Sequence, residues 1–113
     1  MDLSEEAADD VTIVAIAGRL DTQTASRLSE RLTALLGSGQ SHLLIEASRL
    51  NYIGSAGFRA LLLAAKRASA MGGSLAVCST TGPVARVIEI AGLHEVFEVY
   101  PSREAALARL TAA

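Results

Sequence analysis

Short runs of β-branched and apolar residues alternate along the chain with longer segments in which apolar residues recur every three or four positions. Runs of the first kind predict buried strands, and segments of the second kind predict amphipathic helices. The expected strands are 11–18, 42–47, 74–79 and 96–100, and the expected helices are 18–39, 55–71, 80–93 and 102–110. Strands that alternate with helices of roughly 10–17 residues form βα units, so we predict an α/β fold whose sheet is largely parallel in its later part.

The length fits one domain, and we treat residues 1–113 as a single unit. Half of the residues are apolar but only 4% are aromatic, which predicts an aliphatic core. The helix expected at 18–39 should bury one face, made of Ala25, Leu28, Leu32, Leu35 and Leu36. Residues 1–9 are acidic and are expected either to add an edge strand or to stay flexible.

Charge and hydropathy exclude several functions. The formal net charge of −2 argues against nucleic-acid binding, which needs a basic surface to neutralise phosphates. No apolar run approaches the roughly 20 residues that cross a bilayer, so no membrane insertion is expected. The acidic start does not resemble a signal peptide, and a single cysteine suits a reducing compartment. We therefore expect a cytoplasmic protein.

No set of residues assembles a catalytic or metal site. Cys78 ends a predicted strand, but the position where a phosphatase loop carries arginine holds Val84, so a buried structural cysteine is expected. His42 and His94 are isolated from other metal-ligating residues and should lie on the surface near element ends. We predict a protein that binds or is modified, not an enzyme, with no metal and no cofactor.

The stretch NYIGSAGFRALL places Ser55 between Gly54 and Gly57 at the start of a helix. One interpretation is a helix cap, in which the hydroxyl accepts a hydrogen bond from a first-turn N–H and contributes about 1 kcal/mol. The other is a phosphorylation site, because free N–H groups and the helix dipole accommodate negative charge there. Physical chemistry alone leaves both open.

A helical wheel divides the following helix into two faces. The predicted buried face is Phe58, Leu61, Leu62, Ala65, Ala68 and Ser69, with Lys66 at its border, and the opposite face is Arg59, Ala60, Leu63, Ala64, Arg67 and Ala70. Small and apolar residues rimmed by arginine indicate a contact surface, covered either by a partner or by another part of the chain.

Four segments together resemble the STAS domain, and in particular the anti-sigma factor antagonists (anti-anti-sigma factors) of bacteria. They are GRLDTQTA at 18–25, the stretch from LLIEASRL to LLLAAKRA at 43–68, GGSLAVCS at 72–79 and PVARVIEIAGLHEVFEV at 83–99. The resemblance implies a STAS fold with a four-to-five-stranded mixed sheet and about four helices packed mainly on one side.

The resemblance also implies a function. Such proteins bind an anti-sigma factor, a serine kinase with the histidine-kinase-like ATPase fold, and so free a sigma factor. The kinase phosphorylates a serine in the motif Asp-Ser-Ser/Thr-Gly, which maps to Ser55 with Gly57 as its glycine, and a metal-dependent serine phosphatase restores it. Gly54 stands where the family commonly has Asp, and Ala56 replaces the second hydroxyl. Glu46 stands at a strand position that is commonly Asp.

A partner surface follows from this mapping. Asp21 and Thr24 match the family's G-x-L-D-x-x-T turn, which lies near the modified serine. The expected partner-binding residues are Asp21, Thr24, Gly54, Ala56, Gly57, Arg59, Leu63 and Arg67. The alternative is a STAS subunit of a lipid-transport or sensory complex, not phosphorylated, in which Ser55 is only a helix cap. The sequence does not determine the oligomeric state.

Overall fold

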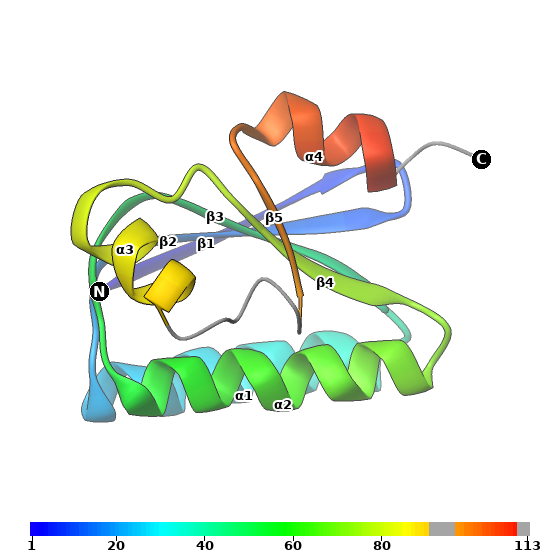
Figure 1. Ribbon diagram of the computed structural model, residues 1–113. Helices are drawn as coiled ribbons and strands as arrows, with labels where there is room; N and C mark the ends of the chain where they lie inside the picture. Colours follow the sequence, from blue (N-terminus) through cyan, green and yellow to red (C-terminus); the bar gives the residue numbers. More distant parts are fainter. Residues whose placement is uncertain (91–96, 111–113) are drawn as a thin grey trace.

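A computed structural model describes residues 1–90 and 97–110 (Figure 1). Its five strands are β1 (Asp2–Ala8), β2 (Val11–Leu20), β3 (His42–Ile53), β4 (Ser74–Cys78) and β5 (Glu98–Tyr100). Its four helices are α1 (Thr22–Gly37), α2 (Ser55–Ala70), α3 (Gly82–Ile90) and α4 (Arg103–Leu110). The predicted alternation of strands and helices is confirmed, with β3 extending further than expected.

The strands form one sheet in the order β1-β2-β3-β4-β5. β1 runs antiparallel to β2, and the later strands are parallel to one another. The mixed α/β sheet of the STAS fold is therefore confirmed, and the acidic N-terminal residues form its edge strand.

Helices cover the two faces of the sheet unequally (Figure 1). α1, α2 and α3 pack against one face, where the larger apolar core lies. α4 lies on the opposite face and buries Ala106 against a smaller group of side chains, Val11, Ile13, Leu44, Ala76 and Cys78. Ser102 accepts a hydrogen bond from the N–H of Ala105 at 3.1 Å and so caps α4. Three of the four helices thus share one side.

Periodicity identified the buried face of α1, because its buried residues are those predicted. In the helix predicted at 80–93, Val84 and Ile88 are buried, but Val87 is 37% exposed, because α3 contacts the core along a narrow stripe. The surface position expected for His94 lies outside the described ranges.

The predicted faces of α2 are partly wrong. Ala60 and Ala64 were assigned to the outer face, but both are buried, whereas Ser69 is exposed. The reason is that α1 lies beside α2 (Figure 1) and covers this side of the helix. Part of the contact surface predicted on α2, at Ala60 and Ala64, is therefore covered by α1.

Among the described residues, no helix combines the length and the hydropathy that a membrane crossing requires.

Candidate functional site

Two neighbouring strands bring the predicted site residues together. β2 and β3 are parallel and in register where Leu20 faces Ile53, so their carboxyl ends lie side by side. The N–H of Gly54 donates a hydrogen bond to the carbonyl oxygen of Leu20 at 3.0 Å, which ties the start of α2 to the start of α1. The N-termini of both helices consequently lie at one edge of the sheet (Figure 1).

A capping box fixes the start of α1. Asp21 is the N-cap, and its Oδ1 accepts hydrogen bonds from the N–H groups of Gln23 at 3.1 Å and Thr24 at 3.0 Å. Thr24 Oγ1 accepts from the N–H of Asp21 at 2.8 Å and donates to the carbonyl of Arg19 at 2.7 Å. The N–H and hydroxyl of Thr24, then Gln23 and Arg19, lower the pKa of Asp21. Asp21 and Thr24 therefore hold the start of α1 in a fixed conformation, and the Asp21 carboxylate there is charged.

Ser55 is not the N-cap of α2, so the structure does not support the helix-cap interpretation. Gly54 occupies the N-cap position with extended backbone and no side chain to bond, and its carbonyl accepts the N–H of Phe58 at 3.1 Å. The cause is the hydrogen bond from the N–H of Gly54 to the carbonyl of Leu20. It keeps the backbone extended through Gly54, so that the helix begins at Ser55. Ser55 is the first helical residue and is exposed, and its hydroxyl has no hydrogen-bond partner within the described chain.

Gly57 and Ala56 serve the packing of this corner. A Cβ on Gly57 would lie 2.6 Å from Leu20 Cγ and 3.0 Å from Ile53 Cγ1, so α2 approaches β2 as closely as it does only because residue 57 is glycine. Ala56 is half-buried against the same core. The motif glycine thus sets the position of the helix that carries Ser55.

Sequence reasoning missed two residues at this corner. Arg19 and Tyr52 face each other across β2 and β3, and the guanidinium carbon of Arg19 lies 4.0 Å from the centre of the Tyr52 ring. The Tyr52 ring also lies over Gly54. An arginine and an aromatic residue at the ends of adjacent strands could have been noticed, but only the strand register shows that they meet.

The remaining predicted residues extend along the exposed side of α2. Arg59 and Arg67 are exposed, and Leu63 is 52% exposed. Leu63 and Arg67 border a groove of about 270 Å³ between α1 and α2, whose other lining residues are Ser29, Leu32, Thr33, Leu36, Ala60, Ala64 and Lys66. The structure therefore places Asp21, Thr24, Gly54 and Ser55 at one end and Leu63 and Arg67 further along the same helix.

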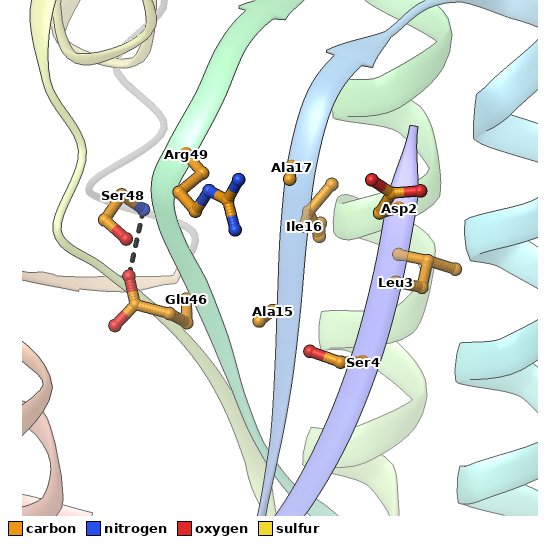
Figure 2. A pocket seen from close by; sticks show the side chains of 9 residues that line it. All are labelled: Asp2, Leu3, Ser4, Ala15, Ile16, Ala17, Glu46, Ser48 and Arg49. Atoms are coloured by element: carbon orange, nitrogen blue, oxygen red, sulfur yellow. Dashed lines mark hydrogen bonds between the residues drawn. The ribbon is translucent and has the colours of Figure 1, made fainter.

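A second polar region lies on the opposite face of the sheet, beside α4. A cavity of about 250 Å³ is lined there by residues of β1, β2 and β3. Figure 2 shows Asp2 and Ser4 of β1 on one side of β2 and Arg49 of β3 extending toward β2 from the other, while the carboxylate of Glu46 points away from β1 toward Ser48. The register between β2 and β3 shifts between Ala15 and Ala17, so β3 has an extra residue at this bulge, and the neighbouring residues Ser48 and Arg49 both line the cavity.

Glu46 is the buried carboxylate of this region. Burial by itself would raise the pKa of Glu46, but hydrogen bonds from Ser48 and Ser79 and the charge of Arg103 hold it below its ordinary value. Glu46 Oε1 accepts the N–H of Ser48 at 2.9 Å, and Arg103 Nε lies 3.5 Å from Oε2. The contact with Arg103 joins β3 to α4. Both carboxylate oxygens of Glu46 thus have partners within the fold.

Cys78 is buried on β4, as expected, next to Glu46. Burial, followed by the charge of Glu46, raises the pKa of the Cys78 thiol to about 11. At neutral pH the residue is therefore a protonated thiol, which is a poor nucleophile. The described residues contain no group of three metal-ligating side chains, and His42 lies half-buried at the start of β3.

Comparison with known proteins agrees with this architecture. The family model described as STAS domain matches residues 3–106. A Bordetella bronchiseptica protein named as an anti-sigma factor antagonist, BtrV, is 35% identical over 96% of this chain and 93% of its own length.

Two solved structures superpose over nearly the whole chain. An anti-sigma factor antagonist from Mycobacterium paratuberculosis has a TM-score of 0.89 at 27% identity, covering 98% of this chain and 94% of its own. The phosphorylated form of the Bacillus cell-fate determinant SpoIIAA has a TM-score of 0.75 at 16% identity, covering 96% of this chain and 98% of its own. This chain therefore belongs to the STAS domain family, among the anti-sigma factor antagonists.

Proposed function

We propose that this protein binds an anti-sigma factor that is a serine kinase of the histidine-kinase-like ATPase fold, and that phosphorylation of Ser55 releases it. The observation that carries the proposal is the state of Ser55. Ser55 is exposed, and its hydroxyl has no hydrogen-bond partner in the described chain; it lies beside the Asp21–Thr24 cap and at the end of the Arg59–Leu63–Arg67 surface. A helix-capping role, the chief competing explanation, belongs instead to the backbone of Gly54.

The modification has a simple chemistry. Ser55 Oγ attacks the γ-phosphorus of ATP bound to the kinase, the bond from that phosphorus to the bridging oxygen of ADP breaks, and the serine proton leaves. The product carries about −1.5 to −2 charges where a neutral hydroxyl stood. Because the N-cap of α2 offers no side chain, first-turn N–H groups remain free to face the phosphate.

Release follows from the position of that charge. A partner docked over Ser55 would meet both added bulk and a doubly charged group in a desolvated interface. A cost of a few kcal/mol suffices, since each step of about 1.4 kcal/mol weakens binding tenfold. A metal-dependent serine phosphatase, for which the exposed residue is accessible, completes the cycle. An ATP-dependent cycle of this kind places the protein in the cytoplasm.

The test is to incubate the protein with the cognate kinase and ATP and to measure intact mass. We expect one added phosphate on the unmodified protein and on Ser69→Ala, which removes an exposed serine from the same helix, and none on Ser55→Ala. Equal labelling of Ser55→Ala would contradict the assignment. Co-purification of a transporter ATPase in place of a kinase would favour the alternative role as a subunit of a lipid-transport or sensory complex.

A further inference from the structure

The Arg19–Tyr52 pair lies at the ends of β2 and β3, and the Tyr52 ring approaches Gly54, the residue that directly precedes Ser55. Arg19 is exposed and Tyr52 is 40% exposed, so the pair is on the surface. Among the described residues, Arg19 has no carboxylate within ion-pair distance; its side chain contacts the Tyr52 ring, and its charge also acts on Asp21. A guanidinium group stacked on a tyrosine stays positively charged and keeps its N–H donors available at the ring edge.

The absence of a side chain on Gly54 allows this arrangement. A Cβ at position 54 would lie 3.2 Å from Tyr52 Oη and 3.4 Å from Tyr52 Cε2, closer than such atoms normally approach. A Cβ there requires the exposed Tyr52 ring to shift by a few tenths of an ångström, so an aspartate, which related motifs commonly carry, would crowd the ring on which Arg19 stacks. Gly54 therefore removes the negative charge that an aspartate would place beside Ser55 and leaves room for the Arg19–Tyr52 pair.

A second cation faces Ser55 from its own helix. Arg59 is four residues further along α2, so the two side chains lie on the same face about 5–6 Å apart at Cβ. Side chains on a helix lean toward its N-terminus, which directs Arg59 toward Ser55. The first turn of α2 contains no acidic residue. Asp21 is the nearby carboxylate, and its own cap bonds already engage it.

We propose that Arg19, positioned by Tyr52, and Arg59 together bind the phosphate group of phosphorylated Ser55 within the same domain. The proposal rests on the proposed function for its biological setting. Phosphorylation then alters the docking surface in two ways, because it adds a phosphate and also engages two guanidinium groups that the unmodified protein presents to its partner. Arg19 and Arg59 contact the phosphate, and Tyr52 is a positioning residue.

The test measures the second pKa of phosphoserine by ³¹P NMR titration, on protein in which phosphoserine is incorporated at position 55 during translation. Cations near the phosphate favour its dianion and lower this pKa. Arg19→Gln and Arg59→Gln should each raise it by about half a pH unit, the effect of one charge roughly 6 Å away in water. Arg67→Gln is the matched control, because it lies about 18 Å further along α2 and should leave the pKa unchanged.

Two further substitutions separate positioning from charge. Tyr52→Phe retains the ring and should titrate like the parent protein, whereas Tyr52→Ala should raise the pKa as Arg19→Gln does. Gly54→Asn adds a side chain without charge, and we expect it to displace the ring and raise the pKa as well. The amide spectrum of each variant verifies that it folds, and Arg19→Gln changes only an exposed side chain.

Equal phosphate pKa values in the parent protein, Arg19→Gln and Arg67→Gln would overturn the proposal, whatever Arg59→Gln does. A raised pKa in Tyr52→Phe would show that the ring is not what positions Arg19, and would overturn that part. Because no kinase is used, the outcome is independent of the labelling experiment. Failure of the kinase to modify Ser55 would overturn the proposed function and not this electrostatic arrangement.

Discussion

Gly57→Ala should destabilise the protein although alanine is the better helix former. The added Cβ would lie 2.6 Å from Leu20 Cγ and 2.7 Å from Leu20 Cδ2. Leu20 is fully buried at the end of β2, and Ile53, whose Cγ1 would be 3.0 Å away, is also buried, so neither can move aside freely. Introducing a methyl group into a filled core costs about 1–3 kcal/mol, while replacing glycine in a helix returns about 0.5–1 kcal/mol. We expect a net loss of about 1–2 kcal/mol in the free energy of unfolding.

Urea unfolding followed by circular dichroism measures this loss, and thermal unfolding should show a midpoint lower by about 4–10 °C. Gly37→Ala is the matched control, since it replaces another helical glycine with no atom within 4 Å of the new Cβ. That variant should keep its stability or gain less than about 1 kcal/mol. If Gly57→Ala proved as stable as Gly37→Ala, the close approach of α2 to β2 would not be what requires glycine in this motif.

Three other predictions concern the surface, the acid response and the thiol. Leu63→Glu should abolish binding to the anti-sigma factor, measured by calorimetric titration, while leaving the thermal midpoint unchanged, because Leu63 is 52% exposed. The control is Ile90→Glu on α3, where the side chain is 78% exposed, and it should leave binding intact in the same titration. Retained affinity in Leu63→Glu would exclude this surface. The pKa of Glu46 is lower in the folded than in the unfolded state, so its contribution to stability is present above about pH 4.3 and is lost as the pH falls through the folded value. Glu46→Gln should therefore show a weaker loss of stability between about pH 5 and 3 in acid unfolding, and an unchanged slope would contradict this reading. Cys78, with a pKa of about 11, should react with iodoacetamide at pH 8 only after denaturant is added, and rapid alkylation of the native protein would argue against its burial.

The position of Gly54 connects these predictions with function. The resemblance to anti-sigma factor antagonists made this glycine a departure from the family motif, since an aspartate commonly precedes the modified serine. In the structure the same position supplies the backbone cap of α2 and the space for Tyr52. Glycine in place of the common aspartate therefore removes a negative charge beside Ser55 and leaves the serine exposed.

The amino-acid sequence by itself determined the order of strands and helices and the buried face of α1. These features follow from apolar spacing within one segment, so that each can be inferred without its neighbours. The edge strand, one of the two alternatives for residues 1–9, and the expected burial of Cys78 also agree with the structure. The motif around Ser55 could likewise be placed at the start of a helix from local pattern alone.

Only the tertiary structure decided the features that depend on contacts between neighbouring helices and strands. The outer face of α2 could not be assigned until α1 was seen to cover Ala60 and Ala64. The helix cap passed from Ser55 to Gly54 because the carbonyl of Leu20, on another strand, fixes the chain one residue earlier. The pairing of Arg19 with Tyr52 depends on a strand register that contains a bulge. Each of these features requires a contact between segments distant in sequence, and such contacts have no signature in the periodicity of either segment.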